Sequence, residues 1–378
     1  MTPFTAARRA RLHGLIAAQV TATGPQAIAA VEAWNLKQPA GGRAWAVVRL
    51  VTKDGLEGWG ESKPLTREHV KSLRERVTGE SAGAYESLAV KLRGHAASAA
   101  VNSAVLDIMA KGSKAPVYQY LGGPTRFKAR AYTSLHGATD GELVQALERS
   151  RAAGYKAFSF TTPQPPFRNS GKAFVLATEK RFKTLQAAAG SDCDFILNGN
   201  GMLTPGDASM LSAAFERSHV LWFDEPCAVT SLGPLRKIAG ESVTPLGFGK
   251  DATDAAFFQN LLREDAIDLC RPELSVLGIS GCRRVAALAE VYYVAVAPRH
   301  AEGPLTTAAA LHLAASLPNF FIQHIPYPDA PADREMRAAL TAEPVEKIQD
   351  GFAALPTKPG LGVTVNRDAL RKFGEVIA

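Results

Sequence analysis

Eight short apolar segments recur at nearly constant steps along the last two-thirds of the chain, and this regularity constrains the fold more than any other feature. The stretches between them are rich in Ala, Leu, Glu, Lys and Arg, a composition typical of amphipathic helices. Eight strand–helix units of about 25 residues each predict a closed (β/α)8 barrel rather than an open sheet. We expect the strands at residues 129–134, 157–161, 194–198, 220–224, 244–249, 267–272, 294–298 and 320–324.

The residues before the barrel follow a different pattern and predict a separate small domain. Residues 26–60 alternate in a strand-like way around a turn signal at Asp54-Gly55, which is typical of a β-hairpin. A helical pattern then runs from Arg67 to Lys111, and a Gly-Gly-Pro sequence ends it. We therefore divide the chain into a lead-in (1–25), an α+β capping domain (26–127), a barrel (128–345) and a C-terminal segment that packs on the cap (346–378).

Charge and composition exclude several classes of partner. The net charge of +7 comes from scattered lysines and arginines, without the basic stripe and interleaved aromatic side chains of nucleic-acid-binding proteins. This charge can still attract small anions. No apolar stretch approaches the length of a membrane span. The four cysteines form no CxxC pair, so we expect reduced thiols in a cytoplasmic protein, with neither nucleic acid nor a membrane as partner.

Six polar residues recur at steps of 23 to 26 residues, each at or just after the end of an expected strand. Active sites in this fold lie at the C-terminal ends of the strands, so these side chains should ring one barrel mouth. They are Asn198, Asp224, Lys250, Glu273, Arg299 and His324. A cationic arc suited to a carboxylate, phosphate or sulfate group is expected from Lys250, Arg299, His300 and His324. The alternative is an internal salt-bridge network of these cations with Asp224, Glu225 and Glu273.

Two further features adjoin the expected mouth. His136 follows the first strand and can face the mouth. The loop at 163–168 is rich in proline, and it either covers the site as a lid or forms a stiff surface loop.

Five motifs, in the right order along the chain, resemble the mandelate racemase/muconate lactonizing branch of the enolase superfamily. They are 55–61 (Gly-Leu-Glu-Gly-Trp-Gly-Glu), 114–123 (Lys-Ala-Pro-Val-Tyr-Gln-Tyr-Leu-Gly-Gly), 222–226 (Trp-Phe-Asp-Glu-Pro), 283–290 with 303–304, and 359–362 (Pro-Gly-Leu-Gly). The fourth is most similar to galactonate-dehydratase-type acid-sugar dehydratases. The resemblance implies an α/β fold, a modified (β/α)8 TIM-like barrel with an N-terminal capping domain, and a symmetric homo-oligomer.

The resemblance also implies a Mg²⁺ ion held by one carboxylate at the end of each of strands three, four and five. The ion would neutralise the charge that develops on an enolate. The matching positions are Asn198, Asp224 and Lys250, of which only Asp224 is a carboxylate. Lys250 brings a positive charge to the place of the ion, where it is expected to pair with Asp224, so we expect no metal cofactor. A shifted strand register would restore a Mg²⁺ site from other carboxylates, namely Asp194, Glu225 or Asp251.

The acid/base positions that the resemblance implies carry other residues too. Ser159 and Thr161 stand where the family has a lysine pair on strand two, and Asn200 stands where some members have a histidine after strand three. Glu273 and Arg299, the latter followed by His300, match an Asp–His pair on strands six and seven. His324 matches a glutamate on strand eight. Neither hydroxyl is a base at neutral pH, and an arginine stays protonated. The usual proton-transfer groups are therefore replaced.

These replacements predict a non-catalytic or strongly diverged relative that binds an anionic, sugar-acid-like ligand at the barrel mouth. The candidate catalytic residues are Lys250, Glu273, Arg299, His300 and His324. The candidate ligand-binding residues are Ser159, Thr161, Asn200, Glu225 and His136. One alternative is a metal-independent lyase or isomerase acting on a carboxylate substrate, with His300 or His324 moving the proton. Another is an ordinary Mg²⁺-dependent acid-sugar dehydratase.

Overall fold

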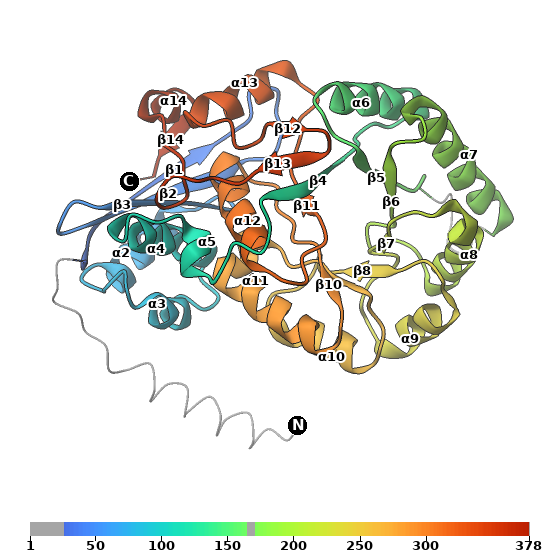
Figure 1. Ribbon diagram of the computed structural model, residues 1–378, viewed down its shortest axis with the longest axis horizontal. Coiled ribbons are helices and arrows are strands. Elements are labelled where there is room, and N and C mark those ends of the chain that lie inside the picture. The colour runs from blue at the N-terminus through green and yellow to red at the C-terminus, as the bar shows by residue number, and fades with distance from the viewer. Residues whose placement is uncertain (1–25, 165–170, 378) are drawn as a thin grey trace.

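The computed structural model describes residues 26–164 and 171–377, which form a cap and a barrel side by side (Figure 1). The lead-in and most of the proline-rich loop, 165–168, lie outside the described residues. The cap sheet has the order β14-β1-β2-β3, with β1 (Ile28–Leu36), β2 (Trp45–Thr52), β3 (Glu57–Ser62) and β14 (Gly374–Val376). Its helices are α2 (Arg67–Val77), α3 (Tyr85–Lys91), α4 (Ser98–Gly112) and α5 (Val117–Tyr120). The turn between β2 and β3 contains Gly55 at φ 83°, a left-handed conformation that favours glycine.

The Gly-Trp-Gly-Glu sequence of β3 couples the cap to the barrel. A Cβ at Gly58 or Gly60 would overlap carbonyl oxygens of α4, so glycine lets β3 pack closely on that helix. Glu61 reaches the barrel, where its Oε2 accepts hydrogen bonds from the backbone N–H and the hydroxyl of Thr306, both at 2.8 Å. Thr306 lies in the first turn of α12 (Pro304–Ser316). Burial raises the pKa of Glu61 to about 7.

Within the described residues the barrel contains eight parallel strands, each at a position that the spacing predicted. They are β4 (Lys128–Ser134), β5 (Ala157–Thr161), β6 (Asp194–Asn198), β7 (Phe223–Asp224), β8 (Leu246–Phe248), β9 (Leu269–Cys270), β10 (Ala295–Val296) and β11 (Gln323–His324). Neighbours pair in parallel from β4 to β10, and β11 pairs with β4. A parallel bridge between Val296 and Phe320 joins β10 to the segment before β11 and closes the ring. The predicted barrel is therefore confirmed.

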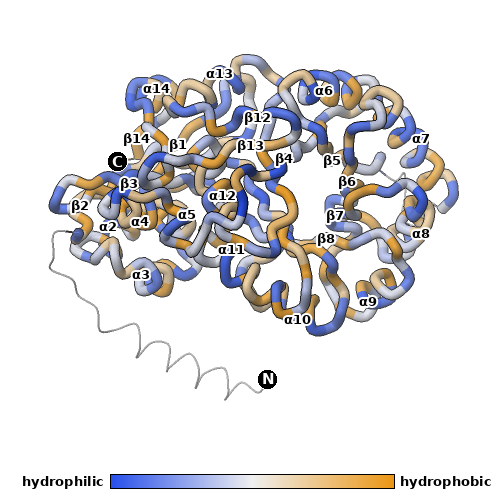
Figure 2. The backbone as a smooth tube through the Cα atoms, in the orientation of Figure 1, coloured by the Kyte–Doolittle hydropathy of each residue, from blue (hydrophilic) through white to orange (hydrophobic). Residues whose placement is uncertain are grey.

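Helices surround the strands and enclose the main hydrophobic core (Figure 1). Besides α12 they include α6 (Asp140–Ala152), α7 (Lys172–Ala189), α8 (Pro205–Phe215), α9 (Leu232–Glu241), α10 (Ala255–Arg263) and α11 (Leu274–Val291), with a short 3₁₀ turn, η1 (Glu216–Ser218), after α8. Figure 2 shows that hydrophobic and hydrophilic residues alternate along these helices, as expected when one face of each helix packs on the strands.

A second, smaller cluster fills the inside of the barrel. Its buried members come from or adjoin seven of the eight strands: Tyr132, Ala157, Ile196, Trp222, Leu269, Ala297 and Ile322. Side chains alternate along a strand, so the residue two positions further along each strand also faces inward, nearer the C-terminal end. Those residues are Ser134, Ser159, Asn198, Asp224, Arg271, Arg299 and His324. This layer forms the floor of the barrel mouth.

The C-terminal segment contacts both parts of the molecule. After α13 (Pro331–Leu340), the strands β12 (Ile348–Gln349) and β13 (Phe352–Ala354) form a hairpin, and β13 pairs antiparallel with β4. Beyond α14 (Arg367–Phe373), β14 joins the cap sheet next to β1. In the Pro-Gly-Leu-Gly motif, Leu361 N donates to Asp107 Oδ1 at 2.8 Å, which ties the segment to α4. Among the described helices, none is long and apolar enough to span a membrane.

Candidate ligand site at the barrel mouth

A buried ion pair joins β7 to the end of β9 at the centre of the mouth. Asp224 Oδ2 accepts a hydrogen bond from Arg271 Nη1, and Oδ1 accepts one from Trp222 Nε1 at 3.1 Å. Arg271 Nη2 donates to the Tyr132 hydroxyl on β4. The two charged side chains are only 4% and 3% exposed. Burial alone would lower the pKa of Arg271, but the Asp224 carboxylate raises it, so the guanidinium stays charged.

Aromatic rings complete the surroundings of this arginine. The Arg271 guanidinium lies 5.5 Å from the ring centroid of Trp222 and 5.9 Å from that of Tyr132. Both distances are within the range of cation–π attraction. Burial raises the pKa of Tyr132 to about 12, so its hydroxyl stays protonated. Arg271 is therefore held from β4, β7 and β9 at once.

Lys250 does not make the contact that the sequence predicted, and the expected pair with Asp224 is wrong. Lys250 Nζ donates instead to the backbone oxygen of Asn200 at 2.6 Å, at the exposed rim. Lys250 lies beyond the end of β8, so the loop and not strand alternation sets its direction. The cation that meets Asp224 is Arg271, which the sequence interpretation missed.

Glu225 is bound by the loop that follows β8, and Asn198 by the loop that follows β6. Glu225 Oε1 accepts hydrogen bonds from the backbone N–H groups of Gly249 (2.7 Å) and Lys250 (2.6 Å). Burial, and then the neighbouring Asp224 charge, raise the pKa of Glu225. Asn198 Oδ1 accepts from Asn200 N at 2.7 Å, in a turn where Asn200 has a left-handed φ of 54°. Both side chains therefore stabilise the backbone at the mouth.

Glu273 and Arg299 are brought together as the strand spacing predicted. Arg299 Nε lies 3.3 Å from Glu273 Oε2, and the two residues form a parallel bridge. The Ser275 hydroxyl donates to Glu273 Oε1 at 3.1 Å. The side chain of Arg299 remains 24% exposed, against 8% for Glu273. The contact uses Nε, so it does not commit the two terminal nitrogens of the Arg299 guanidinium.

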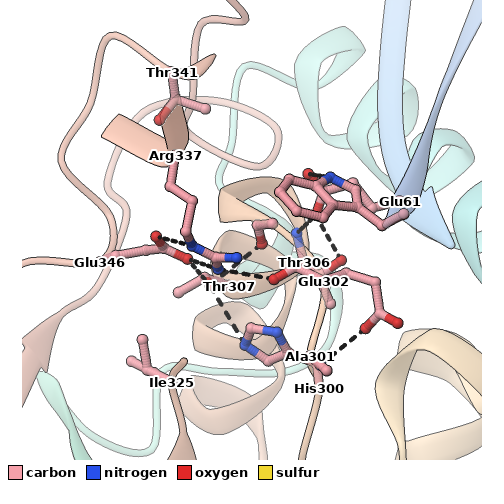
Figure 3. Close-up of polar contacts among 12 residues, drawn as sticks. Glu61, His300, Ala301, Glu302, Thr306, Thr307, Ile325, Arg337, Thr341 and Glu346 are labelled. Atoms are coloured by element: carbon pink, nitrogen blue, oxygen red, sulfur yellow. Dashed lines mark hydrogen bonds and ion pairs between the residues drawn. The ribbon is translucent and has the colours of Figure 1, made fainter. Parts of the chain in front are cut away.

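His300 does not belong to the cationic arc that the sequence predicted. Arg299 and His300 are successive residues, and strand alternation turns only Arg299 inward. His300 is completely buried, with Nε2 3.4 Å from the Thr307 hydroxyl (Figure 3). Thr307 in turn donates to Glu346, which pairs with Arg337 of α13. Burial lowers the pKa of His300 to about 3, so this imidazole is neutral and behind the barrel wall.

His324 does face the mouth, between β11 and β4. Its Nδ1 lies 2.8 Å from the backbone oxygen of His300, and its Nε2 lies 3.2 Å from the Ser134 hydroxyl. Burial, followed by electrostatic interactions with His300 and Arg299, lowers the pKa of His324 well below its usual value. The imidazole is therefore neutral near pH 7. The cations that remain in this region are Arg271, Arg299 and Lys250.

The other predicted residues lie at different depths. Ser159 is buried beside Ser134 in the β4–β5 register, whereas Thr161, Asn200 and His136 are exposed at the rim. Of the alternative carboxylates, Asp194 starts β6, at the far end from the mouth, where it pairs with Arg130, and Asp251 is exposed. Across residues 26–164 and 171–377, no group of three or more His, Cys, Asp or Glu side chains could hold a metal ion.

The sequence interpretation missed Tyr132, Ser134 and Arg271, although a signal for them existed. Each of the three lies on the inward face of its strand. The same face carries either a residue that the spacing had identified or an inward apolar residue. Counting back by two from Glu273 along its expected strand reaches Arg271. The period of 25 residues identifies one inward-facing residue per strand. The alternation of side chains within a strand is needed to find the second inward-facing residue.

Sequence and structure comparisons agree on one family. Residues 28–122 match the mandelate racemase/muconate lactonizing enzyme N-terminal domain, and residues 142–369 match the enolase C-terminal domain-like family. A D-galactonate dehydratase of Xanthomonas campestris pv. campestris (strain B100) is 28% identical over 357 residues, covering 88% of this chain and 91% of that protein. A D-galactonate dehydratase of Verminephrobacter eiseniae is 28% identical over 348 residues, covering 85% and 89%.

Solved structures have the same fold. A mandelate racemase/muconate lactonizing enzyme-like protein from Rubrobacter xylanophilus superposes with a TM-score of 0.83 at 22% identity, covering 93% of this chain and 98% of that one. A mandelate racemase/muconate lactonizing enzyme from Sulfitobacter sp. gives 0.80 at 26% identity, covering 92% and 95%. The arrangement of cap and barrel is therefore common to all three.

Proposed function

This chain belongs to the mandelate racemase/muconate lactonizing enzyme family of the enolase superfamily, and we propose that it binds a sugar-acid-like carboxylate directly on basic side chains of the barrel mouth, without a metal ion. The similarity to D-galactonate dehydratases supports a sugar acid as the ligand. The observation that carries the proposal is the buried contact of Arg271 with Asp224, because it places a cation on the only carboxylate among the three expected ligand positions.

The side chains at these strand ends do not fit Mg²⁺. A hard divalent ion needs several oxygen ligands, usually carboxylates. Asp224 is already neutralised by Arg271, and Asn198 uses its carbonyl oxygen in a turn. Lys250, at the third position, supplies no oxygen ligand and directs its ammonium group to the Asn200 carbonyl at the rim. Glu225, the nearest additional carboxylate, accepts two backbone hydrogen bonds from the β8 loop.

Arg299 is the best placed residue for an anion. Its planar guanidinium can hold a carboxylate by two parallel hydrogen bonds, and the contact with Glu273 through Nε leaves both terminal nitrogens for this purpose. Lys250 at the rim adds a second positive charge. Hydroxyl groups for a polyhydroxylated chain are supplied by Ser159 and Thr161.

Calorimetric titration with D-galactonate, with Mg²⁺ and separately with EDTA, tests this proposal. We expect the same affinity for D-galactonate with Mg²⁺ and with EDTA. Arg299→Met should weaken the binding at least about tenfold, or about 1.4 kcal/mol. Arg236→Met, on the surface of α9 with a 62% exposed side chain, is the matched control and should bind normally. Dehydration of D-galactonate that EDTA abolishes would establish the ordinary Mg²⁺ enzyme instead. Dehydration that resists EDTA would establish a metal-independent lyase.

A gain-of-metal variant provides the complementary test. Replacing Asn198 by Asp, Lys250 by Glu and Arg271 by Gln removes both cations and supplies three carboxylates at the strand ends. We expect this triple variant to bind one Mg²⁺ per chain, measured by calorimetry, whereas the natural protein binds none. Stoichiometric Mg²⁺ on the natural protein would contradict the proposal.

A further inference from the structure

Ser134 and His324 form a hydrogen-bonded pair at the mouth that the binding of a sugar acid does not require. Ser134 is the last residue of β4 and His324 the last of β11, and the two strands pair with each other. Ser134 Oγ lies 3.2 Å from His324 Nε2, and both residues are only partly buried. This pair of groups is therefore within reach of a ligand in the mouth.

The position of the proton follows from the partners of the imidazole. A carbonyl oxygen can only accept, so His324 Nδ1 must carry the hydrogen that it shares with His300 O at 2.8 Å. In the neutral ring Nε2 then holds the lone pair, and the Ser134 hydroxyl donates to it. A hydroxyl held by a base, with the base oriented by a third group, is the arrangement that activates a serine nucleophile.

We propose that Ser134 is a nucleophile and His324 its general base, and that the barrel mouth cleaves an ester or lactone of a sugar acid by acyl transfer. Arg299 belongs to the same inward-facing layer of the mouth as Ser134 and His324, and its contact with Glu273 through Nε leaves the terminal guanidinium nitrogens to supply positive charge for an oxyanion. The choice of a sugar-acid substrate rests on the proposed function, because the acid released is the ligand proposed above. The Ser134–His324 pair itself does not depend on it.

The reaction balances with water as the only co-reactant. Ser134 Oγ forms a bond to the carbonyl carbon while its proton moves to His324 Nε2, and the carbonyl oxygen becomes an oxyanion. The oxyanion collapses, the C–O bond to the leaving oxygen breaks, and His324 gives that oxygen the proton. Water then attacks the carbonyl carbon of the acyl-serine and loses a proton to His324 Nε2. The bond from that carbon to Ser134 Oγ breaks, His324 returns the proton to Oγ, and the acid is released.

Diisopropyl fluorophosphate tests the nucleophile on the full chain. The Oγ–P bond forms, the P–F bond breaks, fluoride leaves and the serine proton goes to the base. We expect one adduct per chain by intact mass, mapped to the Ser134 peptide. His324→Gln should slow labelling at least about tenfold, within the range for loss of a general base. Ser113→Ala, at an exposed serine of the cap, is the control and should label like the natural protein.

Hydrolysis of D-galactono-1,4-lactone in EDTA, followed by pH-stat, tests the substrate class. We expect turnover by the natural protein and its loss in Ser134→Ala. Labelling of the natural protein is informative even if that variant fails to fold. Absence of a Ser134 adduct, or equal labelling of His324→Gln, overturns the nucleophile. Labelling without lactone turnover overturns the substrate class. Normal labelling of Ser134 without binding of D-galactonate contradicts only the ligand proposed under the function above. The two proposals can therefore fail separately.

Discussion

Replacing Arg271 by methionine would leave the Asp224 carboxylate buried without its cation. The two side chains are 4% and 3% exposed, so water cannot replace the guanidinium. Methionine matches much of the arginine stem in shape and tests mainly the charge. Removal of one partner of a buried pair typically costs about 3–5 kcal/mol, because the remaining charge stays desolvated. The contacts with Trp222 and Tyr132 would be lost as well, so we expect the upper half of that range.

Urea unfolding followed by circular dichroism and by tryptophan fluorescence measures this loss. At a slope of about 3 kcal/mol/M, a cost of 3–5 kcal/mol lowers the midpoint by about 1–2 M. The double variant with Asp224→Asn should recover much of the stability, giving a coupling energy of about 2–3 kcal/mol between the two positions. Arg236→Met removes an exposed ion pair and should cost less than about 1 kcal/mol. A loss below about 1 kcal/mol for Arg271→Met, or additive effects in the double variant, would refute the reasoning.

Two more outcomes follow from the packing around the barrel. His300 is neutral in the folded chain because its pKa is lowered to about 3, whereas in the unfolded chain it is protonated below about pH 6.5. Its contribution to the free energy of unfolding is therefore fully present above pH 6.5 and is lost as the pH falls toward 3. The natural protein should lose stability between pH 6.5 and pH 5.0, and His300→Gln should reduce that loss by about 2 kcal/mol, measured by urea unfolding at both pH values. An unchanged loss in His300→Gln, or an equal change in the exposed control His219→Asn, would disprove this. Gly60→Ala should destabilise the cap by more than about 2 kcal/mol in thermal or urea unfolding, because the new Cβ would overlap the backbone of α4. The control Gly233→Ala in α9 places its Cβ in open space and should be neutral or stabilising. Equal effects of the two substitutions would argue against this packing.

The sequence was sufficient for the barrel and for the cap because both depend on short-range patterns. The step of about 25 residues locates every strand, since each unit must place one buried strand and one amphipathic helix in turn. The glycines of Gly-Trp-Gly-Glu and the turn at Asp54-Gly55 are also local signals of close packing and chain reversal. The sequence also shows directly that Asn198 and Lys250, which follow strands at the expected step, are not carboxylates.

Only the tertiary structure decided which charged groups meet. Lys250 and Arg271 are both cations near strand ends, but Lys250 lies beyond the last hydrogen-bonded residue of β8, where the loop turns it to Asn200. Arg271 keeps the inward direction of its strand and crosses the barrel interior to Asp224 and Tyr132, which belong to strands that are not its neighbours in the sheet. The meeting of Ser134 with His324 likewise depends on closure of the ring. Sequence periodicity gives the order of the strands, whereas contacts across a closed barrel depend on its curvature and on the direction of each side chain at the mouth.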